Sequence, residues 1–151
     1  MRWVSAISED GELRGALDAV TADLASGLRG DPVDLLVVFA SQQHLFDLGR
    51  VVPHFRDAFG RDVVTIGCSA AAVVGSHLEL EEQAGLAVLA AHLPGVQLRR
   101  VHVVDDELPA LDGSPAPWRD LVGVDPQLAP DFVVLGDPFS LDHAKLLQGL
   151  D

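Results

Sequence analysis

Basic residues and cysteine are scarce in this sequence. Lysine and arginine together number 10 against 23 acidic residues, and the net charge is −13. Nucleic acids and anionic membrane surfaces are bound by clustered lysine and arginine side chains, so we expect neither as a partner. A small anion held by backbone N–H groups remains compatible with this charge. The single cysteine cannot form an internal disulfide, which fits a reducing compartment.

Long apolar runs are also missing. Residues 1–13 contain Arg2 but lack the apolar stretch of a signal peptide, and they end in acidic residues. No window approaches the roughly 18 uninterrupted apolar residues of a membrane span. We therefore expect a cytoplasmic protein.

The familiar cofactor and metal motifs are absent from the sequence. Neither G-x-x-x-x-G-K nor G-x-G-x-x-G occurs, so a P-loop and a classical dinucleotide fingerprint are excluded. No C-x-x-C and no H-x-x-x-H or H-x-H pair occurs. The histidines are His44, His54, His77, His92, His102 and His143. We expect no metal site and no cofactor.

The remaining composition predicts a folded domain. Of 151 residues 48% are apolar, and the mean hydropathy is +0.26, so the chain can build a core despite its charge. This length fits one domain of ordinary size. We interpret residues 1–151 as a single α/β domain.

The first half alternates between strand and helix patterns. Strands are predicted at residues 2–8, 33–41 and 61–68, and the second is apolar on both faces, as in a sheet covered by helices. A helix capped by Asp10 is predicted up to Leu28. Ser41 is predicted to cap a second helix, which Pro53 kinks or restarts and Gly60 ends. This β-α-β-α-β order implies a partly parallel sheet.

The second half follows a different pattern. Residues 85–93 and 97–104 flank a tight “PGV” connection and predict an antiparallel strand pair. A loop over 105–117, a short helix over 118–122, a strand starting at Asp131 and a helix from Leu141 capped by Ser140 complete the prediction. The predicted fold is thus a mixed α/β sheet with helices packed on it.

The stretch “VVTIGCSAAAVVG” (63–75) holds the main candidate site. A nucleophile on a strained turn needs G-x-S-x-G, but Ala71 stands where the second glycine belongs, and no histidine is placed as a base. A hydrolase or transferase using Cys68 or Ser69 is therefore an alternative only. A second interpretation is that Ala70, Ala71 and Ala72 let a helix pack tightly on the sheet.

The third interpretation of the same stretch is a ligand site. A small-residue turn after a buried strand exposes N–H groups at a helix N-terminus, which favour a carboxylate or phosphate. Ser69 could add a hydrogen bond, and Ala70 leaves room for the ligand. Ser41 and His44 follow the neighbouring strand and would face the same crevice if the two strands are parallel. The acidic runs 79–82 and 105–107 are interpreted as solvated edges.

Four stretches, in this order and spacing, resemble one known family. They are “FASQQH” (39–44), “TIGCSAAAVVG” (65–75), “ELEE” (79–82) before a hydrophobic strand and “LPGV”, and “DPFSLD” (137–142). Together they resemble the N-terminal domain of FIST (F-box and intracellular signal transduction) proteins over nearly the whole chain. “IGCSA” with a downstream Gly75 is the most specific part.

The resemblance implies a non-enzymatic sensory domain that binds small ligands, with amino acids or related small anions proposed, and that serves intracellular signal transduction. It implies ligand contacts at Ser41, His44, Gly67, Cys68, Ser69 and Gly75. In the family a further strand, a glycine-rich segment and a C-terminal domain follow; this sequence shows no counterpart of them. We therefore expect a truncated form with an open sheet edge, which leaves a homo-oligomer, a signalling partner or a scaffold module as alternatives.

Overall fold

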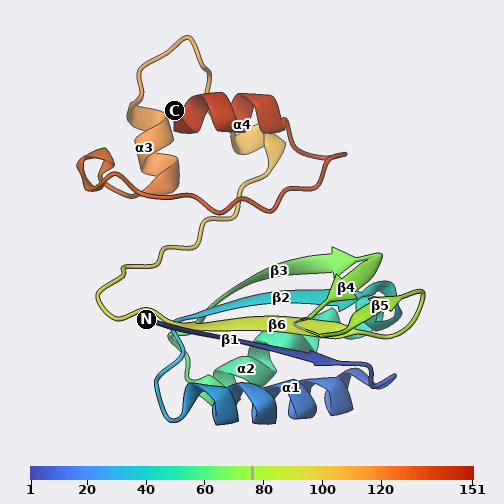
Figure 1. Cartoon of the computed structure of the whole chain (residues 1–151). Coiled ribbons are helices and arrows are strands. Elements are labelled where there is room, and N and C mark those ends of the chain that lie inside the picture. Colours follow the sequence, from blue (N-terminus) through green and yellow to red (C-terminus); the bar gives the residue numbers. More distant parts are fainter. Residues whose placement is uncertain (76) are drawn as a thin grey trace. The chain divides into compact units, whose positions relative to one another are not determined.

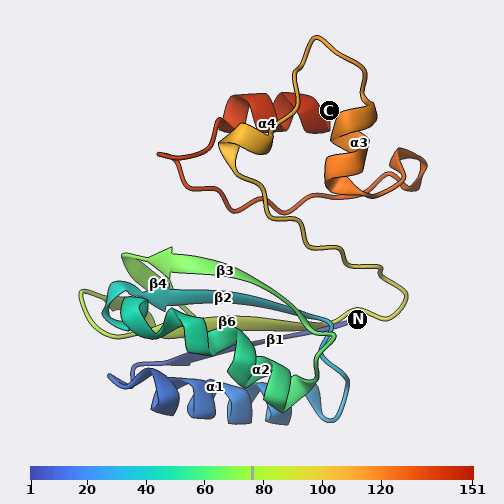
Figure 2. The same ribbon diagram turned by 180° about the vertical axis from the view of Figure 1, so that it is seen from behind.

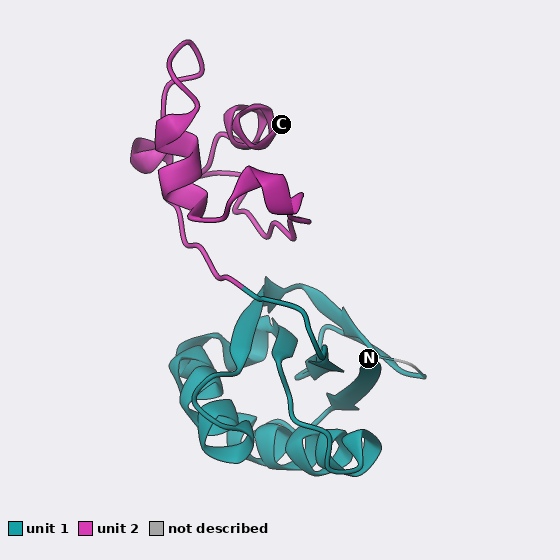
Figure 3. Ribbon diagram, turned by 90° about the vertical axis from the view of Figure 1, so that its left-hand side faces the viewer, with its two compact units in different colours: residues 1–98 teal, residues 99–151 magenta. Residues whose placement is uncertain are grey.

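A computed structural model describes residues 1–75 and 77–151, and these form two compact units. Unit 1 comprises Met1–Leu98 and unit 2 comprises Arg99–Asp151 (Figure 3). The candidate residues of the first half all belong to unit 1. The interpretation of residues 1–151 as one domain stays a prediction.

Unit 1 is built on a four-stranded mixed sheet. Its strands are β1 (Arg2–Ser8), β2 (Leu35–Ser41), β3 (Val64–Ala70) and β6 (Leu86–His92), in the order β1-β6-β2-β3. β2 and β3 are parallel, whereas β6 pairs antiparallel with both β1 and β2. The predicted mixed, partly parallel α/β fold is therefore confirmed.

Helices cover one face of this sheet (Figures 1 and 2). α1 spans Leu13–Leu28, the 3-10 helix η1 spans Gln42–Arg50, and α2 spans Val51–Phe59. The buried positions of α1 recur every three or four residues and so form one apolar stripe. They are Leu13, Ala16, Leu17, Val20, Leu24 and Leu28. η1 ends at Arg50 and α2 begins at Val51, so a new helical segment starts two residues before Pro53. Of the two predicted alternatives, a kink at Pro53 and a restart there, the structure is closer to the restart.

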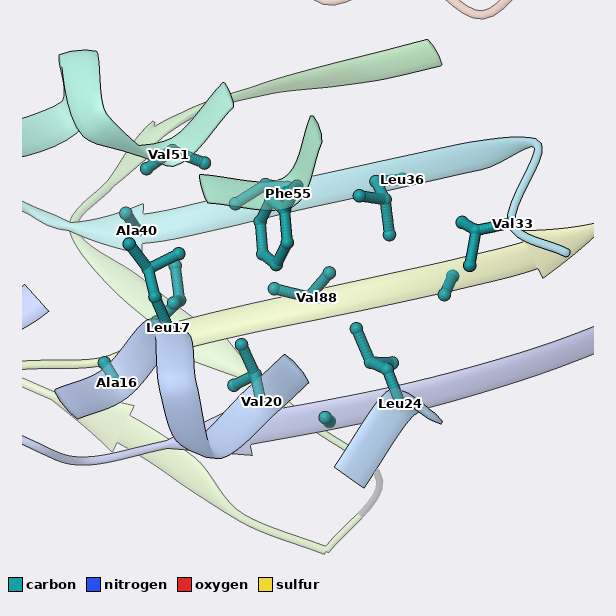
Figure 4. Packing of buried hydrophobic residues seen from close by; sticks show 14 of the residues in the cluster. Ala16, Leu17, Val20, Leu24, Val33, Leu36, Ala40, Val51, Phe55 and Val88 are labelled. Carbon is teal, nitrogen blue, oxygen red and sulfur yellow. The ribbon is translucent and has the colours of Figure 1, made fainter. Parts of the chain in front are cut away.

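The core lies between these helices and the sheet (Figure 4). Phe55 of α2 is fully buried and belongs to the same cluster as Leu36 of β2 and Val88 of β6. Since side chains alternate along a strand, the even-numbered residues of β2 face this core and the odd-numbered ones face the opposite side. The sheet therefore presents two chemically separate faces.

A short hairpin packs on the opposite face. β4 (Ala72–Val74) and β5 (Glu79–Glu81) form an antiparallel pair, and Val73 and Leu80 belong to a second apolar cluster that includes Phe39. The helix expected after Cys68-Ser69 is therefore wrong, because β3 continues through these residues and β4 follows directly. Alternation explains the difference: Val73 is buried while Val74 is exposed, which suits a strand with one covered face.

The prediction that residues 85–93 pair with residues 97–104 is also wrong. β6 covers most of the first segment, but residues 97–104 form no strand. Both edges of β6 are already occupied, by β1 on one side and β2 on the other. No hydrogen-bonding edge of β6 remains for the second segment.

Unit 2 is helical and irregular within the residues described. It contains η2 (Asp105–Glu107), α3 (Ala116–Val122), η3 (Pro126–Leu128) and α4 (His143–Leu150), and Leu108, Trp118 and Leu146 form its buried cluster. The strand expected from Asp131 is wrong, because residues 131–136 have no ladder partner.

Two predicted helix caps differ in the structure. Asp142, not Ser140, caps α4, and its carboxylate accepts a hydrogen bond from the Lys145 N–H at 2.9 Å. Asp10 accepts from the Glu12 N–H, which is still outside α1, so it closes a turn before the helix rather than capping it. Before both α1 and α4, the turn is therefore longer than predicted, and the helix begins later.

Candidate functional site

Ser41 ends β2 and is fully buried. Its hydroxyl accepts a hydrogen bond from the Gly85 N–H at 2.9 Å, and its own N–H donates to the Gly85 carbonyl at 2.8 Å. The predicted cap is wrong, because the Ser41 side chain makes no bond to η1. Ser41 instead fastens the end of β2 to the residue that precedes β6.

His44 lies in the first turn of η1 and is 2% exposed. Its Nε2 atom is buried and has no hydrogen-bond partner among the described residues. A buried polar atom without a partner loses its hydration and gains nothing in return. His44 is thus neither an ordinary surface histidine nor part of a described hydrogen-bond network.

Gly67, Cys68 and Ser69 lie in β3, the outer strand of the sheet, and are exposed. β3 pairs with β2 on one side, and its other edge has no partner within the described residues. A Cβ at position 67 would overlap the backbone carbonyl of Val38, which lies opposite it in β2. Glycine at 67 therefore lets β3 approach β2 closely.

A groove of about 200 Å³ runs beside β3 on the helix-covered face of the sheet. Thr65, Ile66, Gly67 and Cys68 of β3 form one wall. The other walls come from β2, the end of η1 and the start of α2: Val38, Ala40, Leu48, Val51 and Val52. We call this hollow the β3 groove. Its lining is mainly apolar.

Ala70 and Gly75 lie on the other face of the sheet. Ala70 packs with Phe39 in the cluster beneath the hairpin, and a Cβ at Gly75 would meet Ile7 at 2.8 Å. The predicted ligand residues are therefore not one cluster. The structure brings Gly67 and Cys68 together in the β3 groove, with Ser69 next along the exposed strand, and leaves Ala70 and Gly75 to pack the hairpin.

The strand conformation of residues 64–70 changes the chemistry expected at this stretch. No helix begins at Ser69, so the positive helix end that was to hold an anion is missing. No histidine in residues 1–75 and 77–151 hydrogen-bonds Cys68 or Ser69, so the described chain shows no histidine base paired with either side chain. Within unit 1, the β3 groove therefore remains as the candidate ligand site.

Unit 2 contains a hollow of its own, of about 430 Å³, lined by residues 101–106 and 135–141 in part. Asp105 accepts a hydrogen bond from the Asp142 N–H at 2.8 Å. Asp137 accepts from the Ser140 hydroxyl at 2.7 Å and from the Phe139 N–H at 3.0 Å, and these bonds hold the pKa of its carboxyl below its usual value. The two acidic side chains thus stabilise turns.

Within the part of the chain that the structure describes, no three His, Cys, Asp or Glu side chains gather in a way that could hold a metal ion. No helix there is long and apolar enough to cross a membrane.

Sequence reasoning missed most of the lining of the β3 groove. Thr65, Leu48 and Val52 carry no motif, and each is ordinary in its own strand or helix. One signal was available: Thr65 precedes Gly67 by two residues, so both point to the same face of β3.

The fold and the groove define an α/β domain with a mainly apolar hollow of about 200 Å³ beside its outer parallel strand. Residues 34–151 match the family model of the FIST N domain, and the chain belongs to this family. FIST is a sensory, signal-transduction family that is not known as enzymatic. Comparison with curated proteins and with solved structures finds no match.

Proposed function

We propose that this protein is a small-ligand-binding sensory domain and that the β3 groove is its ligand site. The single observation that carries the proposal is that Gly67 and Cys68, at the centre of the “IGCSA” motif, line a groove of unit 1. Amino acids and related small anions are the ligands to test first, and intracellular signalling is the role.

The geometry of the groove supports this proposal. A mainly apolar hollow with a few polar groups is the usual form of a small-molecule site. The groove lies between an outer strand and the restart of the helix at Val51, so a ligand there would contact β3 and α2 together. Such a ligand would stabilise the packing of α2 against β3. A sensor could signal through this change in packing.

Thermal unfolding with a ligand panel tests the proposal. Amino acids, dicarboxylates and small apolar acids are added one at a time to the full chain. A ligand at 100 times its Kd adds about 2.7 kcal/mol of stability, which raises the Tm by several degrees. The substitution Val52→Trp locates the site, because Val52 is half-buried in the lining of the groove and a larger side chain there fills it.

A ligand that binds in the β3 groove raises the Tm of the original chain but not that of Val52→Trp. A panel without any Tm shift contradicts the proposed function. A Tm shift of equal size in Val52→Trp places the ligand elsewhere and contradicts the proposed site.

A second candidate function rests on a different observation. The outer edge of β3 has no strand partner within the described residues, and no lysine or proline interrupts residues 64–70. Such an edge can pair with another extended chain. An interaction module that uses this edge is therefore the alternative to a ligand sensor.

A further inference from the structure

The sheet face opposite α1 and α2 carries no charged side chain along the described strands. Its open part consists of two rows of residues that lie side by side across the four strands. The rows are Trp3, Ala91, Leu35 and Val64, and Ser5, Leu89, Val37 and Ile66. We call these eight residues the open sheet face. A sheet face that meets water normally carries polar side chains, yet here Ser5 is the one polar residue.

A hairpin shields one end of this face (Figure 1). β4 and β5 pack on Ile7, Phe39 and Ala87, which form the next row along the same strands. Beyond that row, Trp3 is 48% and Leu89 is 36% exposed. Contiguous exposed apolar residues on a folded chain mark an interaction site. Within the described residues of unit 1, the sheet is thus apolar on both faces while its helices cover one of them.

The charges beside the open sheet face are negative. Glu79 and Glu81 of the hairpin are exposed, and because side chains alternate along β5, they point away from the sheet when Leu80 points toward it. Glu9 and Asp10 follow β1 at the end of the sheet that bears the hairpin, and both are exposed. A partner that covers the open rows therefore meets several carboxylates at its flank.

No cation of the strands offsets these carboxylates. The strands of unit 1 contain one lysine or arginine, Arg2, and its guanidinium pairs with Asp31 at 2.7 Å. Residues 62–98, which include β3, both hairpin strands and β6, contain no lysine or arginine. Complementary charge therefore has to come from the partner.

The dimensions of the open sheet face suit a single helix. Its two rows are two residues apart along each strand, so they lie about 7 Å from each other, and four strands about 4.8 Å apart make the strip about 15–20 Å long. An α-helix is about 10 Å in diameter and rises about 1.5 Å per residue, so about 10–14 residues cover the strip.

We propose that the open sheet face binds an amphipathic helix of a partner protein that carries lysine or arginine beside its apolar side. The apolar side packs on Trp3, Val37 and Leu89, and the cations pair with Glu79 and Glu81 of the hairpin. This surface goes beyond the proposed function and does not depend on it, because the β3 groove lies on the helix-covered face.

Synthetic peptides of about 14 residues, roughly four helical turns, test the proposal on the full chain. One carries leucine on one helical side and lysine on the other, the second has glutamate in place of lysine, and the third is a scrambled form of the first. Trp3 reports binding, since the chain has two tryptophans and no tyrosine, and the spectrum of Trp3→Phe gives the contribution of Trp118.

We expect the patterned lysine peptide to shift the emission of Trp3 to shorter wavelength and to protect it from acrylamide quenching. The glutamate and scrambled peptides are expected to bind at least about tenfold more weakly, because one is repelled by the carboxylates and the other has no continuous apolar side.

Two matched leucine variants locate the apolar contact. Leu89→Gln places an amide in the middle of the open sheet face and is expected to weaken binding of the lysine peptide about tenfold, as the loss of one leucine contact implies. Leu45→Gln makes the same change at an exposed leucine of η1, on the helix-covered side, and is expected to leave binding unchanged.

Two double variants assign the charged contacts. Glu79→Gln combined with Glu81→Gln is expected to reduce the preference for the lysine peptide over the glutamate peptide. Asp23→Asn combined with Asp57→Asn changes the net charge equally at exposed positions of α1 and α2 and is expected to keep the preference.

The possible results separate this inference from the proposed function. Equal binding of the lysine and glutamate peptides, or an unchanged Trp3 emission with the lysine peptide, overturns the inference. A Trp3 that acrylamide does not reach in the chain alone also overturns it, and a shielding that disappears on dilution identifies a second copy as the occupant. The Tm panel on the β3 groove is independent of all these results.

Discussion

The space around Gly67 is limited by backbone atoms of the neighbouring strand β2 rather than by side chains. A Cβ at this position would overlap the Val38 carbonyl of β2, and backbone atoms of a paired strand cannot rotate away as a side chain can. The same residue forms part of the wall of the β3 groove. The demand for glycine at 67 therefore follows from strand packing alone, with or without a ligand.

Replacing Gly67 with alanine should destabilise the chain. The added methyl group forces β3 away from β2, and overpacking of this kind costs about 1–3 kcal/mol. The free energy of unfolding from urea titrations measures the effect. Gly49→Ala is the matched control, because a Cβ there meets no atom within 4 Å. Equal stability of the two variants would contradict the close approach of β3 to β2.

At the scale of elements, Ser41 connects two strands at their ends. Its buried hydroxyl accepts from the Gly85 N–H just before β6 begins, so Ser41→Ala leaves that N–H buried without a partner. We expect a loss of about 1–3 kcal/mol. Ser69→Ala, at an exposed position of β3, should change stability by less than about 0.5 kcal/mol. Urea unfolding of both variants checks the difference.

This pair of serines also tests the role that the family resemblance implies. If Ser41 acts through Gly85 alone, Ser41→Ala lowers stability, and any ligand affinity measured well below the unfolding transition stays unchanged. A loss of affinity without a loss of stability would contradict the structural role and would favour a direct ligand contact.

The elements that sequence predicted correctly are those with a complete local signal. Strand β1 and helix α1 have patterns that local spacing defines, and β2 has the unbroken apolar run of a strand inside a sheet. Residues 97–104 and 131–136 have equally good strand composition and form none. A strand needs a free neighbouring edge, and the occupation of both edges of β6 by distant segments cannot be deduced from residues 97–104 themselves.

The residues of the candidate site were likewise predictable only where a local sequence pattern defines them. Gly67 and Cys68 follow from their place toward the end of an apolar segment that was predicted as a strand. The opposite wall depends on where α2 packs on the sheet, which a motif does not encode. Ala70 and Gly75 belong to the same stretch as Gly67, yet they face the hairpin, because one residue along a strand reverses the side of the sheet.

At the scale of the whole molecule, two features oppose each other. The edge of β3 has no partner among the described residues and favours pairing with a second copy, whereas the net charge of −13 makes two copies repel. Salt weakens the repulsion, since the Debye length falls from about 10 Å at 0.1 M to about 3 Å at 1 M. Hydrogen bonds between strand edges are much less affected.

We therefore expect self-association that increases with protein concentration and with salt, as measured by sedimentation velocity or light scattering. Ser69→Lys places a charge on the β3 edge and should keep the chain monomeric. Ser26→Lys makes the same change on the exposed side of α1, so it alters the net charge equally and should leave association at the wild-type level or slightly above it. Association that both variants retain would show that copies meet through another surface, and a chain that stays monomeric at every salt concentration would show that the β3 edge does not pair with itself.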